Sequence, residues 1–158
     1  MKLKNNYEKN PCAYDFSDVT EFVVENAKLF AKSFDAELKI LHVFAPMLQG
    51  IVGGIIMAPL NYEVLREELA VKLKNKHKKM LEIKQKLSNE KVNVKASFLE
   101  GKVSKVVLSQ VKEYAPDMII MGSHGHGYMT KVLLGSITMS VLKHAKCPVI
   151  IVPSKAKK

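Results

Sequence analysis

The chain has 158 residues, of which 47% are hydrophobic and 25% charged, a composition typical of one globular domain (residues 1–158) with a core of its own. Its two cysteines are too few for a disulfide scaffold, and its polar residues 1–10 exclude a signal peptide, so we expect a cytoplasmic protein. The net charge of +10 comes mainly from lysines in residues 72–95 and in the tail. Without interleaved aromatic residues these lysines indicate the solvated side of a helix, so nucleic acid is not an expected partner.

Residues 10–14 predict a first strand. Pro11 lacks the N–H that a strand ladder needs, so we expect it at the first position of this strand. Residues 18–33 predict a helix with an apolar stripe, and Asp18 with Glu21 has the spacing of a capping box.

Residues 37–44 predict a second strand, since they alternate and then become continuously apolar. Residues 46–60 are apolar but contain Pro and Gly, and they are too short to span a bilayer. We expect a flap over a site or a partner surface there, with a plain buried loop as the alternative. Residues 61–87 predict one long helix, whose start would project or bend because the helix is longer than a small sheet is wide.

The second half of the chain continues the alternation of strands and helices. Residues 92–98 predict a strand, a helix beginning at Val103 ends before Pro116, and residues 118–121 form a short apolar strand. A further helix continues to Lys146, and residues 148–152 predict a last strand. This order predicts an open five-stranded parallel sheet with helices on both faces, a Rossmann-like α/β fold.

A glycine-rich loop follows the strand predicted at residues 118–121. Glycines let a ligand approach the backbone closely, and successive exposed N–H groups bind anions. Ser136 is a candidate N-cap, so that its hydroxyl and the free amide of Ile137 would face the same anion. Spacing alone leaves phosphate binding and a plain strand-to-helix turn equally open. The loop contains no Walker A lysine, and Gly125-His126-Gly127 lacks the third glycine of a GxGxxG motif.

The complete loop reads Gly122-Ser123-His124-Gly125, nine residues, and Gly135-Ser136. With its apolar flanks, it resembles the nucleotide-binding branch of the universal stress protein family, whose signature is glycine, two residues, glycine, nine residues, glycine, then Ser or Thr. The resemblance covers nearly the whole chain, because Tyr14-Asp15-Phe16-Ser17 and Leu41-His42-Val43 match the first two strand ends of the family. Pro11 and Tyr14 depart from it, since the family has an unbroken apolar strand and a small residue there.

The resemblance implies the strand order 3-2-1-4-5, as in adenine nucleotide α-hydrolase-like folds. In this order Asp15 and Gly122 would converge on one cleft, where open α/β sheets bind ligands. Asp15 would lie near the ribose or a phosphate-bound metal, with a capping carboxylate as the alternative. The backbone of Val43 would meet the adenine edge and its side chain would line the base pocket, with a core residue alone as the alternative. The resemblance assigns the phosphates to Gly122, Ser123, His124, Gly125, Gly135, Ser136 and Ile137.

The implied ligand is ATP, with AMP and ADP left open, and Mg²⁺ or Mn²⁺ would bind through the phosphates. No Cys/His set has the spacing of a zinc site. We therefore expect an ATP-binding regulatory protein of the stress response, without a membrane anchor. A slow metal-dependent ATPase using Asp15 is one alternative, although no carboxylate or glutamine in the loop is placed to orient water. A nucleotide-free interaction protein is the other. The resemblance also implies a homodimer that pairs through the last strand, residues 147–152.

Overall fold

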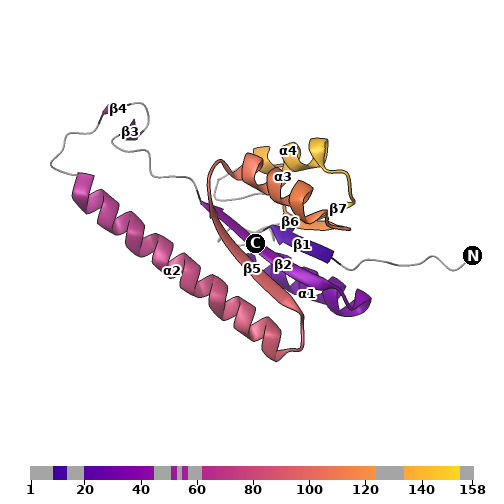
Figure 1. Cartoon of the computed structure of the whole chain (residues 1–158). Helices are drawn as coiled ribbons and strands as arrows, with labels where there is room; N and C mark the ends of the chain where they lie inside the picture. Colours follow the sequence, from indigo (N-terminus) through magenta and orange to yellow (C-terminus); the bar gives the residue numbers. More distant parts are fainter. Residues whose placement is uncertain are drawn as a thin grey trace, which may run out of the picture.

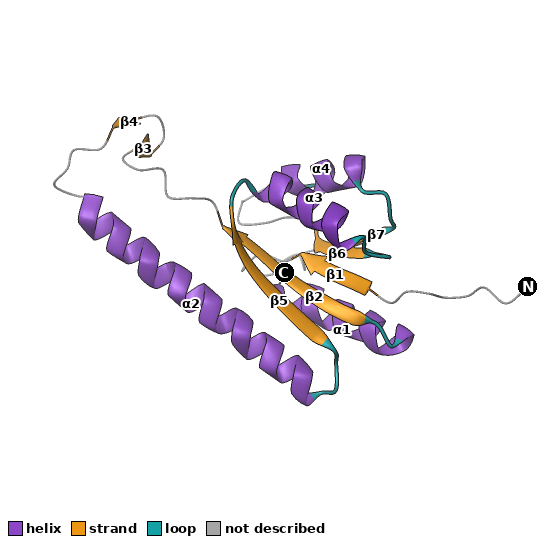
Figure 2. Ribbon diagram, viewed as in Figure 1, coloured by secondary structure: helices purple, strands orange, loops and turns teal. Residues whose placement is uncertain are grey.

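The computed structural model describes residues 9–13, 20–44, 51–52, 55–56, 62–123 and 134–153. Five parallel strands form one sheet, and Figures 1 and 2 show it between two layers of helices. The strands are β1 (Lys9–Ala13), β2 (Glu37–Phe44), β5 (Val94–Glu100), β6 (Ile119–Gly122) and β7 (Val149–Val152). The helices are α1 (Thr20–Phe34), α2 (Tyr62–Asn89), α3 (Val103–Tyr114) and α4 (Ser136–His144).

The sheet has the order β5-β2-β1-β6-β7, which is the order 3-2-1-4-5 when the five parallel strands are counted along the chain. Its apolar strands are buried on both sides, as parallel strands usually are. In β2, Leu38 and Ile40 point into the core beneath α1 and α2, whereas Leu41 and Val43 point into the core beneath α3 and α4. The predicted α/β fold with helices on both faces is therefore confirmed.

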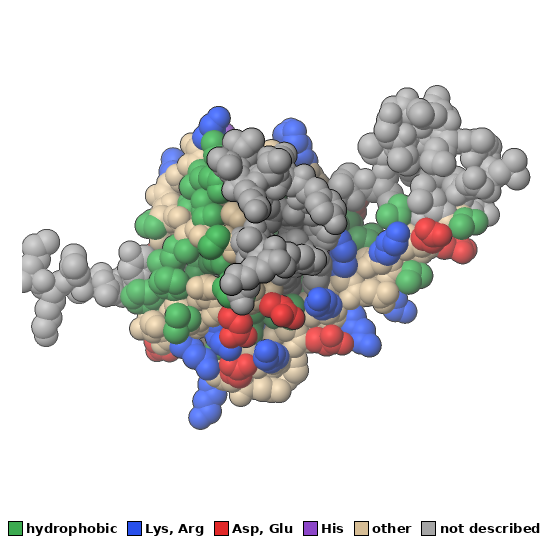
Figure 3. Space-filling model, turned by 180° about the vertical axis from the view of Figure 1, so that it is seen from behind, with side chains coloured by type: hydrophobic (Ala, Val, Ile, Leu, Met, Phe, Trp, Pro, Cys, Tyr) green, Lys and Arg blue, Asp and Glu red, His purple; other side chains and the backbone are tan. Residues whose placement is uncertain are grey.

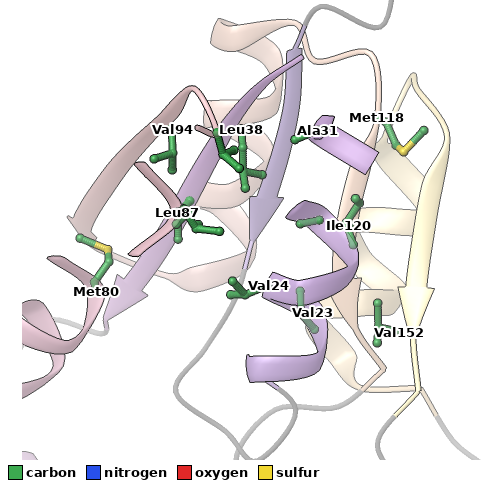
Figure 4. Close-up of a cluster of buried hydrophobic side chains, with 13 residues drawn as sticks. Val23, Val24, Ala31, Leu38, Met80, Leu87, Val94, Met118, Ile120 and Val152 are labelled. Atoms are coloured by element: carbon green, nitrogen blue, oxygen red, sulfur yellow. The ribbon is translucent and has the colours of Figure 1, made fainter. Parts of the chain in front are cut away.

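The core beneath α1 and α2 joins residues that are far apart in sequence (Figure 4). Val23 of α1 and Ile120 of β6 are 1% and 0% exposed. Met80 and Leu87, both in the C-terminal half of α2, are each 1% exposed and complete the cluster over β2 and β5. Burying a side chain of this size stabilises the fold by roughly 1.5–3 kcal/mol, so this end of α2 is firmly anchored to the sheet.

An ionic network reinforces that anchor from the surface. Lys28 of α1 lies 3.0 Å from the Glu90 carboxylate, just after α2, and Lys86 of α2 lies 3.7 Å from Glu25. Hydrogen bonds to Glu25 and then to Glu90 raise the pKa of the Lys28 ammonium. The network therefore connects α1 to the C-terminal end of α2.

The N-terminal half of α2 exposes apolar side chains. Figure 1 shows it running past the edge of the sheet, as expected from the length of the helix. Among its described side chains, Val64 and Val71 are 58% and 57% exposed. Among the described side chains of α2, those buried in the core, Met80 and Leu87, lie in its C-terminal half.

The first strand differs from the prediction. Pro11 is the third residue of β1, not the first, and it lies in register with Lys39 of β2. The proline is tolerated because pairing of β1 with β6 is confined to Cys12 and Ile120, so a missing N–H removes little of that ladder. The strand also ends at Ala13, so Tyr14, Asp15 and Asp18 lie outside the described residues.

The segment at residues 46–60 contains a short antiparallel hairpin, β3 (Ile51–Val52) with β4 (Ile55–Ile56). This hairpin is not among the elements predicted from the sequence. The remaining residues of the segment lie outside the described part, so its role as a flap stays a prediction. None of the described helices combines the length and the apolar character that a bilayer crossing requires.

Gly101 closes the turn after β5 in a conformation that favours glycine. Its φ is +146°, and a Cβ at this position would lie 2.6 Å from Cγ2 of Val106. Its N–H donates a 2.9 Å hydrogen bond to the carbonyl of Phe44, the last residue of β2. The glycine thus fixes the end of β2 beside the start of α3.

Replacing Gly101 with alanine is expected to lower the free energy of unfolding by about 1–3 kcal/mol, because the backbone is strained for an L-residue. Urea denaturation followed by circular dichroism measures this loss. Lys102→Ala is the matched control, since Lys102 is exposed and its side chain caps no backbone group. Equal midpoints for Gly101→Ala and Lys102→Ala would contradict the argument.

Candidate functional site

The candidate site is the edge of the sheet where the parallel strands end. From β1 the chain adds β2 and β5 on one side and then crosses over to place β6 and β7 on the other. The ends of β1 and β6, at Ala13 and Gly122, therefore flank the point where the strand order reverses. Open α/β sheets bind ligands in the crevice outside such a switch point.

Backbone hydrogen bonds clamp the two ends of the glycine loop. The N–H of Ser123 donates to the carbonyl of Val152 at 2.9 Å, which fixes the start of the loop against β7. The N–H of Gly135 donates to the carbonyl of Ser123, also at 2.9 Å. Ser123 of the first part of the glycine motif and Gly135 of the second part are thus in direct contact. His124 and Gly125 lie outside the described residues.

Thr138 connects this clamp to the helix that follows. Its side chain is 3% exposed, and its hydroxyl donates a 3.1 Å hydrogen bond to the carbonyl of Gly122. A second acceptor, the carbonyl of Ser123, lies farther away at 3.5 Å. The end of β6 and the first turn of α4 are therefore held together by one buried side chain. Sequence reasoning missed Thr138, and its only signal was a hydroxyl one turn after the Gly-Ser pair.

The sequence predicts Ser136 as the N-cap of α4, but in the structure the N-cap is Gly135. Gly135 has φ −59° and ψ 149°, and its carbonyl accepts the first helical bond from Met139 at 2.9 Å. Glycine is well suited to this position, and Ser136 becomes the first helical residue. The Ser136 side chain is exposed, and no side-chain hydrogen bond caps the helix. Its hydroxyl is therefore available at the start of α4, next to first-turn amides that have no intrahelical acceptor.

Val43 lies near the end of β2 and is 8% exposed. Its side chain belongs to the same buried cluster as Met121, the residue before Gly122, so the two strand ends share one face of the sheet. Ile137 packs against this cluster from α4. The structure thus places Val43 on the face covered by α4, while Asp15 follows the end of β1 outside the described residues.

The described histidines lie away from this edge or serve packing. His42 points to the opposite face from Val43, where it is 3% exposed and its ring lies 5.0 Å from that of Phe98. His77 of α2 also lies 5.0 Å from the Phe98 ring. In the described part of the chain, no three His, Cys, Asp or Glu side chains gather in a way that could hold a metal ion.

An open parallel sheet with a helix beginning at its switch point defines a doubly wound α/β protein of the kind that binds ligands at strand ends. The model of the Universal stress protein family matches residues 7–153, and the chain belongs to this family. The resemblance seen in the sequence is therefore confirmed.

Relatives and solved structures agree with this assignment. The chain is 30% identical to the universal stress protein YxiE of Bacillus subtilis, over 92% of this chain and 99% of that protein. The solved structure of the protein MJ0577 from Methanocaldococcus jannaschii has a TM-score of 0.72 at 29% identity and covers 96% of this chain and 99% of that one. A protein of the universal stress protein family from Arabidopsis thaliana, solved with AMP bound, has a TM-score of 0.58 at 19% identity, over 94% of this chain and 93% of that one. At this identity the likeness supports only a shared fold.

Thr138→Val is expected to lower the free energy of unfolding by about 1–2 kcal/mol, because a buried hydrogen bond is lost and the Gly122 carbonyl loses its hydroxyl partner. Urea denaturation measures the loss. Amide hydrogen exchange at Gly135 should also accelerate as the clamp loosens. Thr138→Ser keeps the hydroxyl and serves as control. If the amide of Gly135 exchanges no faster in the Thr138→Val variant than in the Thr138→Ser variant, Thr138 does not hold the loop.

Proposed function

We propose that this protein binds an adenine nucleotide, with ATP as its main ligand, and acts as a regulatory protein of the stress response. The observation that carries the proposal is the hydrogen bond from Gly135 to Ser123, which holds the described start of the glycine loop at the start of α4. Helix starts with free amides bind phosphate. The AMP bound to the Arabidopsis protein, which shares this fold, supports an adenine nucleotide as the ligand.

In this proposal each candidate residue has one role. The phosphates contact the backbone and side chains of the loop and the first turn of α4, namely Gly122, Ser123, His124, Gly125, Gly135, Ser136 and Ile137. Asp15 binds the ribose or a metal held by the phosphates. Val43 contacts the adenine through its backbone, which leaves its side chain in the core. Mg²⁺ or Mn²⁺ accompanies ATP through the phosphate oxygens, which are the hard ligands that Mg²⁺ prefers.

Ser136 gives the most direct test of the ligand. Its hydroxyl is exposed and does not cap α4, so Ser136→Ala should weaken Mg-ATP binding at least about tenfold through loss of a hydrogen bond to a charged group. Isothermal titration calorimetry measures the affinity. Ser140→Ala, one turn later in the same helix, makes the same chemical change away from the loop and should bind as the wild type does. Equal affinities for both variants would remove Ser136 from the site, and no binding by the wild type would refute the proposed function.

The same preparation separates a binding protein from an enzyme. A regulatory protein should release phosphate from Mg-ATP no faster than a Gly122→Val variant with a blocked loop. Turnover above that level, lost in Asp15→Asn, would instead support the alternative of a slow ATPase.

We also propose that two copies pair through β7. This strand is the last in the sheet order, and an open strand edge invites pairing. The carbonyl of Pro148 accepts a hydrogen bond from Ile119 of β6, and that of Val152 accepts one from Ser123, just after β6. By the two-residue alternation of a strand, Val149 and Ile151 therefore direct their backbone groups to the open edge. Val149, Ile150 and Ile151 are all partly exposed, and Figure 3 shows hydrophobic side chains gathered on this side, at the left.

Ile151→Pro is expected to convert a dimer into a monomer, because it removes an outward N–H while sparing the hydrogen bonds between β6 and β7. Multi-angle light scattering measures the mass. Ile151→Val keeps the N–H and should stay dimeric. A wild-type chain that is already monomeric at micromolar concentration would contradict pairing through β7.

A further inference from the structure

The N-terminal half of α2 presents an exposed face that the proposed nucleotide site and the β7 edge leave unused. Val64 and Val71 lie seven residues apart, two helical turns, and therefore on one side of the helix. Glu67 and Glu68 lie between them on the same side and are exposed. Lys74, also exposed, continues this face toward the C-terminal end.

The charges on this face are separated along the helix axis. On the N-terminal side of Val71 the face carries the carboxylates of Glu67 and Glu68. On the C-terminal side it carries the ammonium groups of Lys74 and Lys78, and Lys78 is paired with Glu82 at 4.0 Å. A parallel neighbour of the same sequence would set like charges against like. An antiparallel neighbour would set acidic residues against basic ones, and such complementarity between facing helices selects partner and orientation.

We propose that this face binds the same face of a second copy of the chain, with the two helices antiparallel and the two-fold axis at Val71. Around that axis Val71 contacts Val71 of the second copy, and Glu68 faces Lys74. The pair occurs twice because the interface is symmetric, so one residue exchange alters two contacts. The two copies of Val71 supply the apolar centre, and the two pairs of Glu68 with Lys74 set the register.

The charge pattern also argues for a second copy over nucleic acid. The lysines alone would attract a phosphate backbone, but Glu67 and Glu68 lie on the same face and would repel it. The α2 interface is separate from pairing through β7, because α2 packs against β5 at the opposite end of the strand order. The two interfaces therefore do not compete, and the α2 interface does not depend on nucleotide binding.

Cross-linking locates the axis. Val71→Cys and Val64→Cys replace two valines of nearly equal exposure, so collisions between free molecules cross-link both at the same rate. In the antiparallel pair only residue 71 lies opposite itself. A short bis-maleimide should join the Val71→Cys variant about tenfold faster, since pairing raises the effective concentration of the two thiols. Mass spectrometry of the joined peptides separates this product from links through Cys12 or Cys147. Equal rates would overturn the proposal.

Charge exchange tests the register in the full chain. Glu68→Lys and Lys74→Glu should each weaken association about threefold to tenfold, because attractive pairs become repulsive. A one-to-one mixture of the two variants should restore it, since every facing pair is then opposite in charge. Sedimentation velocity of Ile151→Pro derivatives measures α2 pairing without any contribution from β7. Failure of the mixture to recover, or recovery only when nucleic acid is added, would refute self-pairing through α2.

Discussion

The fold depends on one constraint: a parallel strand in the middle of this sheet must be covered on both faces. Residues 38, 40, 41 and 43 of β2 are all buried, but they point alternately into two different cores. Two layers of helices are needed to cover these cores. Each connection between two parallel strands runs over one face of the sheet, and its helix covers that face. Between β1 and β6 the strand order reverses, and the connections on the two sides of this point run over opposite faces of the sheet. A crevice results there at the strand ends. The position of the candidate site is thus a consequence of how the apolar residues are buried.

The candidate site then depends on a small number of short contacts at the end of β6. Ser123 is held by β7, Gly135 is held by Ser123, and Thr138 holds Gly122. These contacts join a strand end and a helix start that are separated by the loop. A ligand that needs several backbone amides in fixed positions gains affinity when the positions are set before it arrives. The clamp is therefore the feature that gives the two described ends of the glycine loop, Gly122-Ser123 and Gly135, a defined geometry.

Much of this arrangement is visible in the sequence, and the exceptions have physical causes. Buried strands such as β2 and β6 are predictable because burial on both faces produces continuous apolar runs. The place of Pro11 in β1 was not predictable, because it depends on how far β6 pairs with that strand. The N-cap at Gly135 was missed because serine is the more frequent cap in such a pair. Thr138 was missed because a buried hydroxyl resembles any other helical threonine until its acceptor is known. Hairpin β3–β4 has only two residues per strand, which is too short for a periodic signal.

The one-ended attachment of α2 has a mechanical consequence. Met80, Leu87 and the ionic network with α1 fix the C-terminal end, whereas the opposite end is held by no buried side chain among those described. The helix therefore behaves as a lever whose fulcrum lies near Met80. From there to Tyr62 the arm is about 27 Å long, so a rotation of about 5° at the fulcrum moves the tip by about 2 Å. Small changes in packing over β5 are thus amplified at the far end of α2.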